Sequence, residues 1–197
     1  MKLITLFILA YLAGSVNFAI ILFSVLGKGD PRLQFSGNAG TTNVYRMAGP
    51  VWAAVVLLLD VGRAVLVALL ARYALTPGQV PWAGIALVAG NRYPCFHGFR
   101  GGKGVANYLG FSAVITPAGA AVSCIAWVCV YIVRRVPFIA SFTMIGVLAV
   151  ATIVACGYEP WAIAGSVLLA AFILLNHRTN IEAMLSKKGE KEDAGED

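Results

Sequence analysis

The chain has 197 residues, of which 59% are hydrophobic and only 12% are charged. Soluble domains carry about 25% charged residues, so this composition excludes an ordinary soluble domain and indicates a chain that lies in lipid. The net charge of +6 does not indicate a nucleic-acid-binding protein, because the basic residues lie between long apolar runs. We expect one polytopic membrane domain over residues 1–185 and a charged, disordered cytoplasmic tail over residues 186–197.

Seven apolar segments are candidates for membrane-spanning helices. Their ranges are 3–26, 51–71, 80–96, 104–116, 118–133, 138–156 and 160–176. Residues 104–133 are too long for one spanning helix, which needs about 20 residues, and Pro117 divides them because proline ends or kinks a helix. The sequence therefore predicts an all-α integral membrane protein with seven transmembrane helices, some of them short or broken.

The basic residues lie mainly on one side of these seven spans. The loops 27–50 and 97–103, the turn 134–137 and the tail share that side and hold most of the Lys and Arg side chains. Cytoplasmic segments carry an excess of Lys and Arg. We therefore expect the N-terminus outside and the C-terminus in the cytoplasm.

The first of three polar segments on the cytoplasmic side is SGNAGTTNVYR, residues 36–46. Gly37 and Gly40 allow tight bends, and Arg46 supplies a bidentate fork for an anion. Short hydrogen-bonding side chains come from Ser36, Asn38, Thr41, Thr42 and Asn43. From these residues alone, an anion-binding loop and a polar loop that only satisfies its own backbone both remain open.

The second polar segment, HGFRGGKG at residues 97–104, has the composition of a phosphate-binding loop. Gly101, Gly102 and Gly104 let backbone N–H groups approach an anion, and Lys103 adds positive charge. A helix is expected to begin at about Gly104, so its positive end faces the same place. This reading is favoured over a glycine hinge with a snorkelling lysine. A Walker A loop is excluded, because Gly104 follows the lysine where Ser or Thr is needed.

The third polar segment, NHRTN at residues 176–180, follows the last span. Alone it is better explained by anchoring to lipid headgroups.

Within the second span, Asp60 and Arg63 are three residues apart, a spacing that allows them to pair on one helix face. Ions inside a membrane are costly and are usually paired or functional. We expect a structural pair near the site.

Taken together and in order, these segments resemble the bacterial acyl-phosphate:glycerol-3-phosphate acyltransferase family, PlsY. The resemblance rests on GSVNF (14–18), DPR (30–32), SGNAGTTNVYR (36–46), DVGR (60–63), FRGGKGVA (99–106) and HRTNI (177–181). The chain departs from the family motifs at several positions. Asn17 and Ala39 stand where the motifs have proline, Thr41 where they have alanine, Arg63 where they have lysine, and Asn91 where they have histidine. No role of that histidine is therefore carried over to Asn91.

The resemblance implies a seven-span enzyme of the bacterial inner membrane whose active site faces the cytoplasm. Such an enzyme transfers a long-chain fatty acyl group from acyl phosphate to the sn-1 hydroxyl of glycerol 3-phosphate. The products are lysophosphatidic acid and inorganic phosphate, in the first acylation step of phospholipid synthesis. Acyl-CoA and acyl carrier protein are not expected as direct donors, and membrane lipid is a further expected partner.

The resemblance also suggests roles for single residues. Arg46 and Lys103 would hold phosphates, and Ser36, Asn43 and Asn180 would position substrate oxygens. His177 is either the general base or a binding residue beside a substrate phosphate that takes the proton itself, and the second reading is favoured. Backbone N–H groups of the glycine loops would stabilise an oxyanion. We expect no metal site and no cofactor.

A transporter or channel for a phosphorylated solute is the alternative, because it would also explain buried ions and broken helices. It predicts polar residues that reach both faces of the membrane. The outer side offers few of them, namely Arg72, Gln79 and Glu159. A protein that merely binds lipid headgroups would not need three coordinated segments. The asymmetry favours an enzyme that is open on one face.

Overall fold

The computed structural model describes the backbone of residues 1–193 and the side chains of residues 1–186. These residues form ten α-helices and three short 3-10 helices. In chain order they are α1 (Lys2–Ser15), α2 (Phe18–Val25), η1 (Pro31–Leu33), α3 (Thr41–Ala48), α4 (Pro50–Ala74), η2 (Pro77–Gln79), α5 (Val80–Arg92), η3 (Cys95–His97), α6 (Val105–Ile115), α7 (Pro117–Arg134), α8 (Pro137–Ala155), α9 (Pro160–Leu175) and α10 (Arg178–Asp193).

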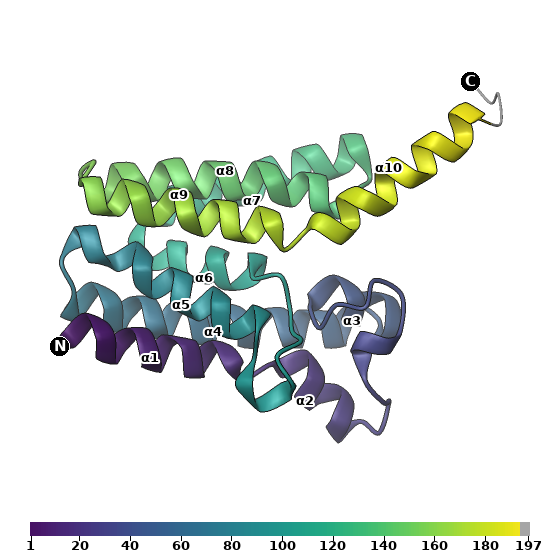
Figure 1. Cartoon of the computed structure of the whole chain (residues 1–197), viewed down its shortest axis with the longest axis horizontal. Coiled ribbons are helices and arrows are strands. Elements are labelled where there is room, and N and C mark those ends of the chain that lie inside the picture. Colours follow the sequence, from purple (N-terminus) through teal and green to yellow (C-terminus); the bar gives the residue numbers. More distant parts are fainter. Residues whose placement is uncertain (194–197) are drawn as a thin grey trace.

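The long helices lie side by side in two groups (Figure 1). In one group α1 packs on α5 and α4 packs on α6, and in the other α7 packs on α8 and α8 on α9. Contacts of α5 with α9 and of α6 with α7 join the groups. Figure 1 shows the N-terminus at the left end of this bundle and α2, α3 and α10 at the right end. The three polar segments therefore share one end.

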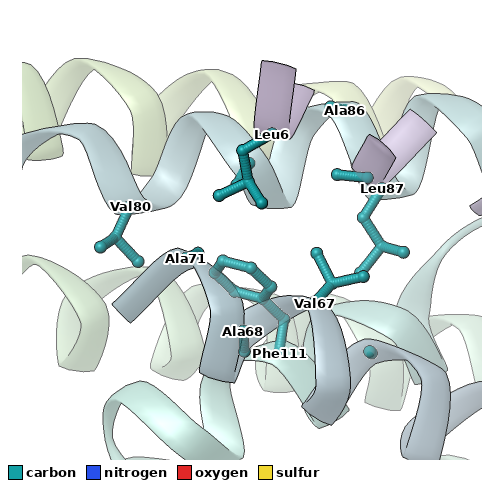
Figure 2. Close-up of a cluster of buried hydrophobic side chains, with 11 residues drawn as sticks. Leu6, Val67, Ala68, Ala71, Val80, Ala86, Leu87 and Phe111 are labelled. Carbon is teal, nitrogen blue, oxygen red and sulfur yellow. The ribbon is translucent and has the colours of Figure 1, made fainter. Parts of the chain in front are cut away.

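One core cluster joins the helices of the first group (Figure 2). Leu6 of α1, Val67 of α4, Leu87 of α5 and Phe111 of α6 meet there, and each is buried. Small residues bring α1 and α5 close together, as is common between membrane helices. A Cβ atom on Gly14 would collide with the backbone of α5 at Leu87, so the close approach requires glycine.

Within the described residues, four helical segments are long and apolar enough to cross a membrane, namely Lys2–Val25, Pro50–Ala74, Pro117–Arg134 and Pro137–Ala155. A fifth is formed if Pro160–Leu175 and Arg178–Ser186 count as one span with a 44° bend. Helices α5 and α6, with 13 and 11 residues, are shorter than the expected spans. They rise only about 20 and 16 Å, against a hydrocarbon core of about 30 Å.

The exterior of the bundle is apolar. Large side chains that are mostly exposed include Leu58, Leu66, Ile125, Val133 and Leu175. A water-soluble protein rarely exposes so continuous an apolar surface, and lipid covers it at no cost.

The predicted break at Pro117 is confirmed, because α6 ends at Ile115 and α7 begins at Pro117. The first predicted span, 3–26, is not one helix. It breaks at Val16–Asn17, where the Asn17 side chain accepts a hydrogen bond from the Ile20 N–H (3.1 Å) and caps α2. The predicted span 80–96 ends early, at Arg92, because Pro94 follows and the turn of η3 begins.

Helix α10 continues through the charged segment that the sequence analysis expected to be disordered. Most residues between Ser186 and Asp193 are Lys, Glu and Ser, and Lys and Glu are good helix formers. The last four residues of the predicted tail, 194–197, lie outside the described residues.

Candidate active site

The first polar segment folds around the side chain of Asn43, which is completely buried. The Asn43 amide donates to the carbonyl oxygens of Pro31 (2.7 Å) and Gln34 (3.3 Å), and its Oδ1 accepts from the Ser36 hydroxyl (3.1 Å). The expected role of Asn43 in orienting substrate oxygens is thus wrong in its direct form, because loop atoms use both ends of the amide. Asn43 holds Ser36 at the surface of the loop.

Helices α3 and α6 begin beside the first and second polar segments. Gly40 caps α3 and Gly104 caps α6, and neither helix start has a side-chain cap. The first N–H groups of a helix have no partner inside the helix, so both ends are suited to bind an anion. Gly104 has φ +96°, a conformation that side chains other than glycine rarely adopt.

The backbone N–H groups of Gly101 and Gly102 are not free for an anion, contrary to expectation. They donate to the carbonyl oxygens of Arg92 (3.1 Å) and Asn91 (2.9 Å). A Cβ on Gly102 would lie 2.7 Å from the Asn91 amide nitrogen and 3.0 Å from the Ala39 carbonyl oxygen. These glycines therefore serve to seat the second segment closely against α5 and the first segment.

Arg32 holds the first and second segments together. Its guanidinium forms an ion pair with Asp30 (2.7 Å) and donates to the carbonyl oxygens of His97 (2.6 Å) and Arg100 (2.9 Å). Because Asp30 and the two carbonyls occupy it, this arginine is a structural clamp between the loops.

Lys103 and the third segment meet directly. The Lys103 Nζ donates to the Asn180 Oδ1, and the Asn176 amide donates to the Lys103 carbonyl oxygen (3.2 Å). The structure thereby brings together Lys103 and Asn180, which the sequence analysis placed in one site. Burial, with the positive charges of Arg92 and Arg46 nearby, lowers the pKa of Lys103 to about 8.

His177 lies in the turn between α9 and α10 and is almost fully buried. Its Nδ1 contacts the Ile173 carbonyl oxygen at 2.8 Å, and because a carbonyl only accepts, Nδ1 carries the proton of the neutral ring. Nε2 is then the free acceptor. Burial and the positive charge of Lys103 lower the pKa of His177 to about 4, so the ring is neutral at pH 7.

Beneath these loops lies a buried polar network centred on Arg63. The predicted Asp60–Arg63 pair is confirmed at 2.8 Å. Arg63 Nη2 also donates to the Oδ1 atoms of Asn107 (2.6 Å) and Asn91 (3.4 Å). Asn91 in turn accepts the Gly102 N–H through its backbone, so this branch of the network supports the second segment.

The other branch of the network supports the first segment. The Arg63 guanidinium donates to the carbonyl oxygens of Gly14 (3.2 Å) and Val16, which the break between α1 and α2 leaves without helical partners. The next residue, Asn17, donates to the Ala39 carbonyl oxygen (3.2 Å). An irregular backbone inside an apolar bundle needs such partners.

The three segments thus converge at one end of the bundle, but not every predicted site residue has the role that was expected for it. Ser36 is exposed on the loop before α3, and Thr42 and Arg46 are exposed on α3 itself. Thr41 has a buried hydroxyl without a partner among the described residues. Gly37, Asn38 and Gly40 shape that loop. Two residues of the site, Arg92 and Asn176, had no predicted role of their own. Arg92 could have been recognised because it is a charged residue inside the predicted span 80–96. Charges within membrane spans are costly and usually functional.

We predict that the affinity for inorganic phosphate falls about tenfold per pH unit above about pH 8, where Lys103 loses its proton. Calorimetric titration between pH 7 and 10 measures this fall, and a constant affinity up to pH 10 would contradict it. The free energy of unfolding should rise over the same range. The unfolded chain keeps the lysine proton up to about pH 10.5. Deprotonation at lower pH therefore removes the cost of burying a charge in the folded state and leaves the unfolded state unchanged.

Known proteins resemble this chain over almost its whole length. A family model described as glycerol-3-phosphate acyltransferase matches residues 4–187. The glycerol-3-phosphate acyltransferases of Azotobacter vinelandii and Pseudomonas aeruginosa (strain LESB58) are 38% and 37% identical, and each match covers 91% of this chain and 94% of the relative.

Two solved structures share the fold. A crystal structure of PlsY, an integral membrane glycerol 3-phosphate acyltransferase, in its glycerol 3-phosphate form aligns with a TM-score of 0.87 and 32% identity. That alignment covers 95% of this chain and 94% of the other. The lysophosphatidic acid form aligns with a TM-score of 0.84 and 31% identity, over 95% of this chain and 93% of the other.

Proposed function

Because this chain belongs to the glycerol-3-phosphate acyltransferase family, we propose that it is a membrane enzyme that acylates glycerol 3-phosphate to lysophosphatidic acid. The observation that carries this proposal is the fold shared with structures of the PlsY enzyme in its glycerol 3-phosphate and lysophosphatidic acid forms. The cationic site around Lys103 supplies the chemistry that a phosphorylated substrate requires.

We further propose acyl phosphate as the donor. Each substrate then carries a phosphate group, and the first and second segments each provide a helix start and a cation, Arg46 or Lys103. In the described part of the chain the ion pairs are Asp30–Arg32 and Asp60–Arg63, so no carboxylate neutralises Arg46 or Lys103. This supports a site that is completed by anionic substrates.

In the proposed reaction the sn-1 hydroxyl oxygen of glycerol 3-phosphate attacks the acyl carbonyl carbon. A tetrahedral intermediate forms, and the bond between the carbonyl carbon and the phosphate oxygen breaks. Phosphate leaves with the electron pair of that bond, and the hydroxyl proton ends on the phosphate. Since phosphate is a good leaving group, orientation and charge neutralisation supply most of the catalysis.

The residues would divide this work as follows. Lys103 neutralises a phosphate, and Asn180 holds the Lys103 Nζ in place. Ser36, fixed by Asn43, positions a substrate oxygen. The free Nε2 of His177 accepts a hydrogen bond from a substrate hydroxyl. The N–H groups at the start of α6 are suited to stabilise the oxyanion.

For the topology we propose seven membrane crossings, with the N-terminus outside and the site at the cytoplasmic face of the inner membrane. The grouping of all three polar segments at one end of the bundle supports this arrangement (Figure 1). The excess of Lys and Arg in the loops of that side supports it as well. Helices α5 and α6 would cross only part of the lipid, and their neighbours in the bundle would cover them.

The test of function is turnover by the purified protein. With acyl phosphate and glycerol 3-phosphate, we expect equal amounts of lysophosphatidic acid and inorganic phosphate, measured by mass spectrometry and a phosphate assay. Use of acyl-CoA without phosphate release would refute acyl phosphate as donor. No product with either donor would refute the acyltransferase.

We predict that His177→Ala keeps measurable turnover, with a raised KM for glycerol 3-phosphate. A base with a pKa of about 4 removes a hydroxyl proton poorly, so substrate phosphate is the better acceptor and His177 serves mainly in binding. Steady-state rates for each substrate measure the effect. His97→Ala is the control, since only the backbone carbonyl of His97 contacts Arg32. Complete loss of kcat with unchanged binding would show instead that His177 is the base.

A further inference from the structure

Arg92 is a basic residue at the proposed site to which neither the motifs nor the proposed mechanism gives a task. It is the last residue of α5, and its carbonyl oxygen accepts the N–H of Gly101 at 3.1 Å. The second segment therefore starts its tight turn against the backbone of Arg92. Lys103 lies two residues after Gly101.

Aromatic contacts hold the Arg92 side chain toward α9. Its guanidinium carbon lies 5.3 Å from the centre of the Tyr93 ring, and that ring lies 6.3 Å from the ring of Phe172. Phe172 is one helical turn before Asn176, whose amide donates to the Lys103 carbonyl oxygen. Arg92 thus lies at the junction of α5, the second segment and the end of α9.

The residues that the structure describes do not satisfy the hydrogen-bonding capacity of Arg92. Its Nε atom is buried and has no hydrogen-bond partner among the described residues. The described side chains also give it no ion pair. Its positive charge is close enough to lower the pKa values of both Lys103 and His177. Like charges gathered without a counterion are unfavourable, and a bound anion would relieve the repulsion.

We propose that Arg92 is a further substrate-binding residue, which binds together with Lys103 the phosphate group of one of the two substrates. The inference rests on the proposed function and goes beyond it by adding a second cation to the Lys103 subsite. A guanidinium is suited to this task, because its planar fork matches two phosphate oxygens, whereas a lysine acts as a point charge.

A structural role is the competing explanation. A basic residue in the last turn of a helix interacts favourably with the helix dipole, and stacking on Tyr93 adds a cation–π contact. Both effects would stabilise α5 without any ligand. They predict changes in thermal stability, whereas phosphate binding predicts changes in KM and in phosphate affinity.

The test uses Arg92→Gln and Arg92→Lys in the full-length protein, with Arg72→Gln as a matched control. Arg72 also lies in the last turn of its helix, α4, and donates to the carbonyl oxygen of Val114, far from the three polar segments. The measurements are KM for each substrate, the dissociation constant of inorganic phosphate by calorimetry, and the melting temperature.

With Arg92→Gln we expect the dissociation constant of phosphate and the KM of one substrate to rise about tenfold to a hundredfold, as for a lost hydrogen bond to a charged group. Arg92→Lys should show a smaller rise, and Arg72→Gln none. The substrate whose KM rises identifies the phosphate that Arg92 binds.

Unchanged phosphate affinity and KM in Arg92→Gln, with or without a lower melting temperature, would overturn the inference. If Arg92→Gln does not fold, Arg92→Lys decides the matter by the same measurements. Failure of the proposed function looks different, because the unaltered protein would then give no turnover with either donor. The calorimetric arm needs no turnover and still reports whether Arg92 binds phosphate.

Discussion

Replacing Lys103 by Met is expected to lower kcat/KM by about a thousandfold while the protein stays folded. Removing one preorganised donor from an active site commonly costs about 100- to 1,000-fold, and here a positive charge at a phosphate is lost as well. Methionine has a similar length and places no polar group of its own in the half-buried position, although the Asn180 Oδ1 loses its donor. Initial rates over both substrate concentrations, together with the melting temperature, separate catalysis from stability.

Two further variants sharpen this result. Lys28→Met removes a charge from the same end of the bundle but from an exposed loop position, and should keep its activity within about twofold. Lys103→Arg keeps the charge but not its position beside Asn180, so partial activity is expected. A Lys103→Met protein that retains a tenth or more of the activity would show that another group neutralises the phosphate.

The helical architecture could be predicted from the sequence because its signals are local. Apolar runs mark the long helices, and proline marks where α7, α8 and α9 begin. The break at Asn17 was missed, although asparagine is a preferred helix cap. The long apolar runs before Gly14 and after Asn17 concealed it. What maintains the break is Arg63, which lies about 50 positions further along the chain.

The residues of the site were recognised, but the tasks of several were not. The glycines of the second segment were expected to present their N–H groups to an anion, yet Gly101 and Gly102 donate to the end of α5. Asn43 was expected to face substrate, yet it organises its own loop. The contacts of the two glycines join the second segment to the end of α5, and those of Asn43 depend on how its own loop folds, so no short sequence pattern specifies either. The local sequence correctly predicts that these positions are polar, but it does not predict which partners their polar groups contact.

Three of the departures from the family motifs, those at Asn17, Arg63 and Asn91, have a common location. Arg63 donates to Asn91 and to the carbonyl next to Asn17, so all three positions belong to one network. An arginine offers five N–H donors. The side-chain oxygen of Asn91 accepts from one of them, and the side chain of Asn17 caps α2 at the break that Arg63 stabilises. We infer that these residues act as a set.

Replacing Arg63 by Ala is therefore expected to lower the free energy of unfolding by about 3–5 kcal/mol, the cost of leaving one partner of a buried ion pair alone. The side chains of Arg63 and Asp60 are 7% and 8% exposed, so water does not replace the lost partner. The carbonyls of Gly14 and Val16 lose their donor as well. Thermal unfolding in detergent, compared with the unaltered protein, measures the loss.

The double variant Asp60→Leu/Arg63→Leu separates the ion pair from the positioning role. Removing both charges should restore much of the stability lost in the Arg63 variant, because no buried charge remains unpaired. Activity should not recover with it, since Asn91 and the break at Val16 still lack the guanidinium that holds both loops. If the losses of stability and activity in the double variant equal the sums of the losses in the two single variants, this coupling is contradicted. Recovery of both together would show that Arg63 serves only its carboxylate partner.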